Sequence, residues 1–308
     1  MILILTDRDE SSTCEVIDWL LFQKQEFIRI HREDKIDITI SNDPVIHLET
    51  ESFRLSEITA YWYRRGYFDN AYPKPRNTVI SRFMESEEKE VNKLLHFLLK
   101  EKKHIGSLFD NYLSKLEVLH VARKFEIRVP DTLITSRKEE LAKFTKDRRV
   151  ITKSITNSFS LEVNDTFFFL PTVELTDLWE FPERFSPILV QELLDKKYEL
   201  RIFYLEGKFY SSVIFSQSDP QTALDFRHYN SEKPNRVCPF QLPTSIADKL
   251  TQLMNHFQLK SGSIDMVVTK AGEYVFLEVN PIGQFKQVSE PCNYYLEEKI
   301  CNILMNKN

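Results

Sequence analysis

The residues best suited to hold a cation lie in one predicted hairpin near the end of the chain. The pattern over 263–280 predicts two strands, and a turn at Ala271-Gly272 would place Asp265 directly opposite Glu278. Because side chains alternate along a strand, Asn280 lies on the same face as Glu278. Facing carboxylates repel each other unless a cation separates them, and carboxylate and amide oxygens suit Mg²⁺ when phosphate oxygens complete its shell. The alternative is a solvated acidic hairpin whose last residues only end the strand.

A second predicted hairpin, over 199–217 with its turn at Glu206-Gly207, carries an acid and a permanent cation on one face. Alternation along the strand points Glu199 and Arg201 to the same side. A carboxylate suits sugar hydroxyls and a guanidinium suits a phosphate, so the pair is a candidate nucleotide-binding group. The alternative is a surface ion pair, which is common and contributes little to stability.

Two lysines lie on separate predicted elements from which both can reach phosphates. Lys115 lies where a helix opens, and Lys153 ends a predicted strand over 150–153. An isolated lysine is usually a solvent-exposed surface residue, and that alternative stays open for both.

Several familiar chemistries are excluded by the composition. No two of the six glycines lie closer than Gly262 and Gly272, so neither G-x-G-x-x-G nor a Walker loop occurs. The seven histidines form no H-x-x-x-H pair, and none neighbours a cysteine at zinc spacing. No serine lies in G-x-S-x-G. The chemistry therefore has to rest on carboxylates, lysines and arginines.

Charge and cysteine usage predict a cytoplasmic protein. The 308 residues include 41 Lys and Arg against 46 Asp and Glu, a net charge of −5, which gives no reason to expect a nucleic-acid partner. The four cysteines form no C-x-x-C pair and read as reduced thiols. We find no signal peptide and no apolar run long enough to span a membrane, so no membrane partner is expected.

The elements that must position these residues predict an α/β (α+β) protein of three parts. A strand over 2–5, a helix over 13–22 and strands over 27–30 and 36–40 indicate a small N-terminal α/β domain. Further helices are expected over 85–100, from about residue 110, and over 246–257, and the segment 72–77 is expected to be a loop. A hairpin over 161–170 would turn at Asn164-Asp165. We place the boundaries at 1–105, 106–188 and 189–308.

The order of the motifs resembles the ATP-grasp fold of carboxylate–amine and carboxylate–hydroxyl ligases over nearly the whole chain. After the N-terminal α/β domain come, in order, Asn111…Lys115, Val129-Pro130-Asp131-Thr132, Val150-Ile151-Thr152-Lys153, Val190-Gln191-Glu192-Leu193-Leu194, Glu199-Leu200-Arg201, Asp225-Phe226-Arg227, Asp265 and Glu278-Val279-Asn280-Pro281. More narrowly, the chain is similar to the maturases of graspetides, the microviridin-type peptides. Ile2-Leu3-Ile4-Leu5, Phe27-Ile28-Arg29-Ile30 and Trp62-Tyr63-Arg64-Arg65-Gly66 resemble the grasp-with-spasm branch.

This resemblance implies a role for each candidate residue, with ATP and Mg²⁺ as cofactors. For the nucleotide, it implies that Lys115 and Lys153 contact the ATP phosphates, that Glu199 binds the ribose, and that the adenine hinge is formed by Gln191, Glu192, Leu193 and Leu194. For the reaction, it implies that the transferring phosphoryl group is contacted by Arg201, Arg227 and Lys153. It implies that magnesium is held by Asp265, Glu278 and Asn280. One departure is the lid segment over 154–160, which lacks the glycines common in that fold.

The same resemblance implies an ADP-forming ligase acting on a ribosomal precursor peptide made of a leader and a core. Asp or Glu side chains would be activated as acyl-phosphates and joined to Thr, Ser or Lys side chains, and the enzyme would be a homodimer. Two alternatives stay open: an ATP-grasp ligase that adds a free amino acid to a peptide or protein, and a non-catalytic ATP-binding protein.

Overall fold

The structure is a computed structural model that describes residues 1–70, 75, 77–156, 160–163, 166–169, 172–176, 180–228 and 230–307. The chain forms two compact units: unit 1 is Met1–Tyr112, Leu259–Gly262 and Pro281–Asn308, and unit 2 is Leu113–Gln258 and Ser263–Asn280. The C-terminal segment therefore returns to the N-terminal unit. The boundaries expected after residues 105 and 188 stay a prediction.

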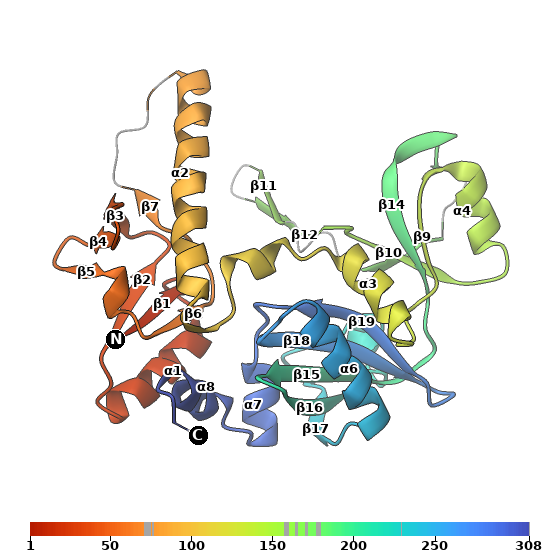
Figure 1. The fold of residues 1–308 in the computed structure, drawn as a ribbon. Helices are drawn as coiled ribbons and strands as arrows, with labels where there is room; N and C mark the ends of the chain where they lie inside the picture. Colours follow the sequence, from red (N-terminus) through yellow and green to blue (C-terminus); the bar gives the residue numbers. More distant parts are fainter. Residues whose placement is uncertain are drawn as a thin grey trace. The chain divides into compact units, whose positions relative to one another are not determined.

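Unit 1 is built on a four-stranded parallel sheet in the order β2-β1-β6-β8. Its strands are β1 (Ile2–Thr6), β2 (Phe27–His31), β6 (Ala60–Tyr63) and β8 (Lys103–Ile105). Every residue of β1 is buried, as expected of a parallel strand covered on both faces, which is why it reads as a continuous apolar run. The helices α1 (Ser11–Phe22) and α8 (Leu296–Leu304) pack side by side, although they come from opposite ends of the chain (Figure 1). The predicted strand–helix–strand opening is confirmed.

A second, smaller sheet and a long helix complete the N-terminal part of unit 1. The sheet has the order β5-β4-β3-β7, formed by β3 (Lys35–Thr39), β4 (Val45–His47), β5 (Ser52–Arg54) and β7 (Asp69–Asn70), with a 3₁₀ turn over Leu55–Glu57. The helix α2 (Thr78–Lys100) begins seven residues before the predicted start, because the Asn77 side chain caps it by accepting the N–H groups of Val79 and Ile80 at 2.9 and 3.3 Å. Its apolar first turns are exposed, so periodicity did not reveal them. Residues 72–74 and 76 of the predicted loop lie outside the described residues.

A buried ion pair fixes the C-terminal return within unit 1. Arg64 Nη2 lies 2.8 Å from Glu10 Oε1, and Arg64 Nη1 donates to the Gly283 carbonyl at 3.1 Å. Both side chains are almost fully buried. Burial by itself raises the pKa of Glu10, but Arg64 and the hydroxyls of Ser12 and Thr13 outweigh it and hold the pKa at about 2.

The Glu10 carboxylate is expected to make the stability of unit 1 pH-dependent on the acid side. Because its folded pKa lies below the unfolded value of 4.5, its contribution is fully present above pH 4.5 and is lost as the pH falls toward 2. The shift corresponds to about 3 kcal/mol. The free energies of unfolding of the wild type and of Glu10→Gln, measured by urea denaturation, should therefore differ most at about pH 6. At about pH 3 this difference should be smaller by about 2 kcal/mol. An equal difference at both pH values would contradict this assignment.

The first sheet of unit 2 is antiparallel and has the order β13-β10-β14-β9. It comprises β9 (Thr132–Arg137), β10 (Val150–Lys153), β13 (Val173–Glu174) and β14 (Arg184–Glu192), and α4 (Lys138–Thr145) follows β9. Leu141, Val150 and Val190 form its small core. The hairpin of β11 (Ser160–Val163) and β12 (Thr166–Phe169) is confirmed by the Val163–Thr166 pairing. Its turn at 164–165 and residues 157–159 of the lid segment lie outside the described residues.

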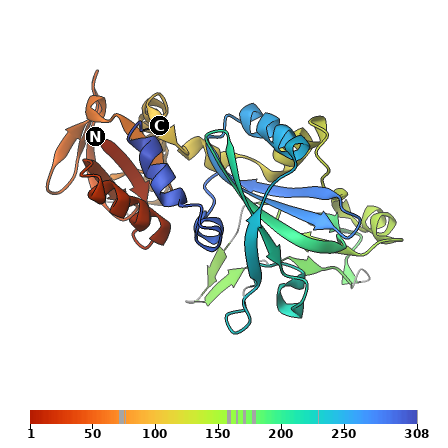
Figure 2. The same ribbon diagram turned by 90° about the horizontal axis from the view of Figure 1, so that it is seen from below.

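The second sheet of unit 2 has five strands in the order β17-β16-β15-β18-β19. Its strands are β15 (Lys196–Leu205), β16 (Lys208–Phe215), β17 (Arg236–Phe240), β18 (Ser261–Thr269) and β19 (Tyr274–Asn280). The helices of this part of unit 2 are α3 (Lys115–Lys124), α5 (Pro220–Ala223) and α6 (Thr244–His256). The predicted turn at Glu206-Gly207 is confirmed, since both residues have positive φ, 44° and 85°, as a two-residue type I′ hairpin requires. Helix α6 buries its apolar side against one face of this sheet (Figure 2).

Within the described part of the chain, no helix is both long and apolar enough to cross a membrane.

Candidate active site

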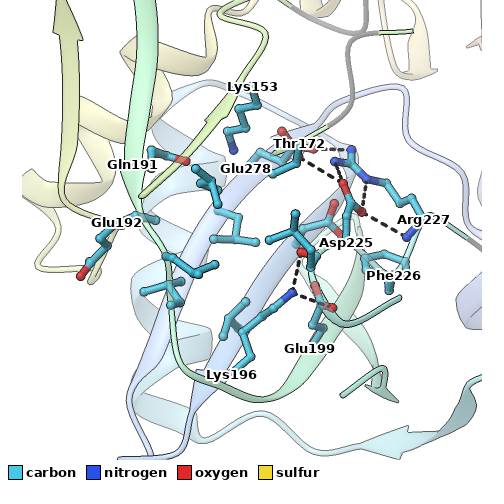
Figure 3. A pocket seen from close by; sticks show the side chains of 18 residues that line it. Lys153, Thr172, Gln191, Glu192, Lys196, Glu199, Asp225, Phe226, Arg227 and Glu278 are labelled. Carbon is cyan, nitrogen blue, oxygen red and sulfur yellow. Dashed lines mark hydrogen bonds and ion pairs between the residues drawn. The ribbon is translucent and has the colours of Figure 1, made fainter. Parts of the chain in front are cut away.

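A pocket lies between the two sheets of unit 2, and most of the predicted site residues line it (Figure 3). Strands β10 and β14 contribute from one side, and β15, β18 and β19 contribute from the other. The predicted residues among its lining are Lys153, Gln191, Glu192, Leu193, Leu194, Glu199, Arg227, Asp265 and Glu278. Lys115 and Arg201 do not line it but pair with carboxylates that do.

The predicted facing of Asp265 and Glu278 is confirmed, although the turn differs from the expected one. The chain reverses over Lys270-Ala271-Gly272, a three-residue turn with Gly272 at φ 86°, and Thr269 N–H donates to the Glu273 carbonyl at 3.0 Å. Between the turn and Met266, the pairing of β18 with β19 is therefore shifted by one residue from the predicted register. A bulge between Asp265 and Met266 restores it, so that Asp265 pairs with Glu278.

Three cations surround the Glu278 carboxylate. Lys115 Nζ lies 3.2 Å from Oε2, and Arg227 Nη1 lies 3.4 Å from Oε1. Lys153 extends toward Glu278 from the end of β10 (Figure 3). Burial alone raises the pKa of Glu278, but these positive charges outweigh it and lower the pKa. The cations exceed the charge of this carboxylate, and such an excess suits a polyanion.

Lys115 reaches this position because it is the first residue of α3. The N-cap Ser114 accepts the N–H of Glu117 at 3.5 Å, so the helix begins at Lys115 rather than near residue 110, and a 3₁₀ turn over Leu108–Tyr112 precedes it.

The pKa of Lys153 is lowered, and burial of the side chain is the main cause. The negative charge of Glu278 opposes this effect.

Asp265 is engaged by Arg201 on the adjacent strand of the five-stranded sheet. Arg201 Nη1 donates to Asp265 Oδ1 at 2.6 Å, and the two side chains are about nine-tenths buried. Burial raises the pKa of Asp265, and Arg201 opposes that effect. The guanidinium thus lies against the carboxylate rather than in the pocket. Its predicted role at the phosphoryl group stays a prediction.

Arg227 is held by a carboxylate to which the sequence analysis assigned no role. Asp225 accepts from Arg227 Nε at 2.8 Å and from Nη2 at 2.6 Å, and Thr172 Oγ1 donates to the same carboxylate at 3.2 Å. Burial favours a higher pKa for Asp225, but the paired guanidinium holds it at about 2. This bidentate pair orients the remaining nitrogen, Nη1, toward Glu278. The motif Asp225-Phe226-Arg227 contained the signal, since its acid lies two residues before its arginine.

Lys196 is a second residue that the sequence analysis missed. Its Nζ donates to Glu199 Oε1 at 3.1 Å and to the Leu224 carbonyl at 2.8 Å, and Ser216 Oγ donates to the same Glu199 oxygen at 2.7 Å. Residues three apart on a strand point to opposite faces, so periodicity could not pair Lys196 with Glu199. Burial raises the pKa of Glu199, and the charge of Lys196 opposes that rise.

The predicted hinge is tied to neighbouring strands. Gln191 Nε2 donates to Thr132 Oγ1 at 3.0 Å. The Glu192 carboxylate accepts from Arg128 and from the Asp131 N–H, both at 2.9 Å, and Figure 3 shows it pointing away from the other labelled side chains. The Leu193 N–H donates to the Arg149 carbonyl at 2.9 Å. The Glu192 N–H also donates to the Asp131 carbonyl, at 3.0 Å, so both the carboxylate and the amide of Glu192 are already engaged within the protein.

The donor set fits magnesium only with help from a ligand. Among the described residues, no three His, Cys, Asp or Glu side chains lie close enough to hold a metal ion. Asp265 and Glu278 supply two facing carboxylates, and Asn280 lies exposed two residues further along β19, paired with Ser263. Two carboxylates and an amide leave coordination positions open. This suits Mg²⁺, which is usually held by one or two carboxylates together with substrate phosphates.

No known protein-family model matches the sequence, and no curated protein sequence matches it. Solved structures do match over their whole length. A RiPP-associated ATP-grasp ligase of Chryseobacterium gregarium, solved with ADP and a leader and core peptide, is 22% identical with a TM-score of 0.84, covering 100% of this chain and 97% of that one. The macrocyclase MdnC of Microcystis aeruginosa, bound with the precursor peptide MdnA, is 24% identical with a TM-score of 0.77, covering 100% of both chains.

Two further structures show how widely the fold is shared. The ATP-grasp ligase PsnB, complexed with a minimal precursor, Mg and ADP, is 16% identical with a TM-score of 0.75, covering 99% of this chain and 96% of that one. D-alanyl-alanine synthetase A of Vibrio cholerae is 14% identical with a TM-score of 0.59, covering 100% and 98%. The predicted fold is thereby confirmed.

Proposed function

We propose, from the ATP-grasp fold of this chain, that it is an ADP-forming ligase that crosslinks side chains within a ribosomally made precursor peptide. The observation that carries the proposal is the charge layout at one end of the pocket, where Lys115, Lys153 and Arg227 face Glu278 and Asp265. Fixed cations beside a pair of oxygen ligands stabilise a phosphoryl group in transfer. A peptide carboxylate would attack the γ-phosphorus of ATP and displace ADP.

The second half of the reaction needs no covalent group from the enzyme. A hydroxyl or amine of the same peptide would attack the acyl carbon of the acyl-phosphate and displace phosphate, so each bond removes one water and converts one ATP to ADP and phosphate. Magnesium, held by Asp265, Glu278 and Asn280 together with phosphate oxygens, would supply charge neutralisation on the nucleotide. Asp225 would hold the Nε and Nη2 nitrogens of Arg227 and so keep its remaining nitrogen, Nη1, aimed at the transferring group.

The proposed positions of adenine and ribose follow from the hydrogen-bonding groups of the pocket that are not already engaged by other protein groups. Since the Leu193 N–H donates to Arg149, the amide offered to adenine would be that of Leu194. Lys196 and Ser216 both bind Oε1 of Glu199, which leaves Oε2 for the ribose hydroxyls.

Two alternatives are weaker. The RiPP-associated ATP-grasp ligase and the macrocyclase MdnC, both solved with peptides, match with TM-scores of 0.84 and 0.77, against 0.59 for D-alanyl-alanine synthetase A, which favours a peptide substrate. A non-catalytic ATP-binding protein would have no need for the oriented Arg227 beside the two carboxylates.

The test is incubation of the chain with ATP, Mg²⁺ and candidate precursor peptides, followed by mass spectrometry. We expect the loss of one water per crosslink and ATP turnover only when the peptide is present. Peptide-independent turnover, or turnover with a free amino acid as acceptor, would overturn the proposal.

A further prediction concerns Glu199. Glu199→Gln keeps the acceptor for Lys196 and Ser216 but removes the charge that strengthens hydrogen bonds to the ribose, so the KM for ATP should rise about tenfold while kcat changes little. Steady-state kinetics would check this, with Glu126→Gln as the matched control because that exposed carboxylate pairs with Lys249 at the surface. A large loss of kcat at unchanged KM would contradict the ribose role.

Three finer expectations belong to the same proposal. The enzyme would be a homodimer, which light scattering after size exclusion would show as twice the mass of one 36.5 kDa chain. It would act in the cytoplasm. The central lid-bearing part, 106–188, and the metal-bearing part, 189–308, would be separate subdomains of the ligase.

A further inference from the structure

A second polar pocket lies within unit 1, between α1, α8 and α7 (Lys286–Cys292). It has a volume of about 350 Å³, and four carboxylates line it: Glu15, Asp18, Glu290 and Glu297. The ammonium of Lys286 pairs with Glu15 and, at 3.0 Å, with Glu290. Among the described residues of this pocket and the lysine that pairs with them, four carboxylates face one ammonium, an excess of three negative charges. None of these residues belongs to the site of unit 2.

The deepest of these carboxylates is incompletely satisfied. Glu297 is 8% exposed, and its Oε2 accepts from Ser289 Oγ at 2.9 Å. The same hydroxyl accepts the N–H of Leu296 at 2.9 Å. Glu297 Oε1 is buried and has no hydrogen-bond partner in the described part of the chain. A buried charged oxygen without a donor is costly, so the pocket lacks a cation or donor at this point.

The helix terminus explains only part of this arrangement. Glu297 lies in the first turn of α8, where the helix dipole favours an acid. The first-turn amide of Leu296 is nevertheless taken up by Ser289, not by Glu297. The dipole therefore accounts for the presence of an acid and supplies no donor to Oε1.

Two aromatic rings also line the pocket. Trp19 comes from α1, and Tyr295, which is 57% exposed, comes from the residue before α8. The faces of Trp and Tyr rings attract organic cations. Within the described residues, no three carboxylates lie close enough to hold one metal ion, whereas an organic cation with several N–H donors can reach carboxylates that lie further apart.

We propose that this pocket binds one organic cation, the ammonium or guanidinium group of a lysine or arginine side chain or of a free polyamine. The cation supplies a hydrogen-bond donor to the Glu297 carboxylate, whose Oε1 has none among the described residues. Asp18 adds charge at the exposed side, and the rings cover the alkyl part. Lys286 already illustrates the chemistry, since two carboxylates of the pocket raise the pKa of its ammonium.

The test follows the indole N–H signal of Trp19 in the full-length protein by NMR, assigned with Trp19→Phe among the three tryptophans. We expect a saturable shift with n-butylammonium and with argininamide that weakens at high salt, and no saturable shift with n-butanol. Glu297→Gln should weaken binding about tenfold. Asp18→Asn, at an exposed position that tolerates the change, should weaken it up to about fivefold.

A control and two further probes complete the design. Glu26→Gln, which removes one exposed charge from unit 1 outside the pocket, should bind like the wild type. Tighter binding of spermidine than of the peptide acetyl-Gly-Lys-Gly-amide would identify a polyamine as the ligand, and the reverse would identify a polypeptide. Absence of a saturable shift, an equal response to n-butanol, or wild-type binding by Asp18→Asn would overturn the proposal. The readout needs no ligase activity, so it stands apart from the proposed function.

Discussion

Glu278→Gln should lower the rate of peptide crosslinking by about a thousandfold at saturating ATP. The change removes one of two facing carboxylates, and a metal-assisted contribution of about 4 kcal/mol corresponds to that factor. The same change leaves Lys115 and Lys153 without the charge of Glu278, while Arg227 keeps its ion pair with Asp225. Magnesium-free ADP should therefore bind at least as tightly as to the wild type, and added Mg²⁺ should no longer strengthen binding. Calorimetry with and without Mg²⁺ measures both effects.

The matched control is Glu273→Gln, which changes an exposed acid directly after the turn of the same hairpin that does not line the pocket. It should keep wild-type turnover. Asp265→Asn should also abolish crosslinking, but it leaves the buried Arg201 without its partner, so its thermal stability has to be measured in parallel. Wild-type turnover by Glu278→Gln at low magnesium would overturn the metal assignment.

Arg227→Ala should lower kcat about a hundred- to a thousandfold, or roughly 2.7–4 kcal/mol, while ADP affinity changes much less. Its side chain is half exposed, and one nitrogen faces Glu278, so it is placed to meet charge that develops during phosphoryl transfer. Arg227→Lys should recover only part of the rate, because lysine lacks the fork that Asp225 binds at two points. Arg236→Ala, an exposed arginine on β17, is the control.

Arg201→Ala is a less informative test of whether an arginine stabilises the transferring phosphoryl group. Removing one partner of a buried ion pair typically costs about 3–5 kcal/mol of stability, so loss of activity would be mixed with loss of folded protein. Arg201→Lys keeps the charge beside Asp265 and is the variant to compare. If the Arg227 and Arg201 variants bind nucleotide poorly yet still crosslink at saturating ATP, both arginines serve binding, and the proposed mechanism is misassigned.

Local sequence patterns were enough to predict a contact where that contact depends on a single strand or a single turn. Alternation along β15 predicted that Glu199 and Arg201 share a face, and the hairpin pattern predicted that Asp265 opposes Glu278. The pairing held although the turn was misjudged, because the bulge beside Asp265 compensated for the longer turn. Backbone hydrogen bonding along a short hairpin leaves few registers, which is why such predictions succeed.

Local sequence patterns predicted the strands, the hairpins and the residue types of the candidate site. Which of these elements contact one another depends on how they pack in the folded chain. Lys115 contacts Glu278 because α3 packs beside β19, and Arg201 pairs with Asp265 because β15 lies beside β18 in the sheet. The acidic pocket of unit 1 exists because α8 returns to α1 from the other end of the chain. Such contacts depend on how whole elements pack, and periodicity within one element carries no information about its partner.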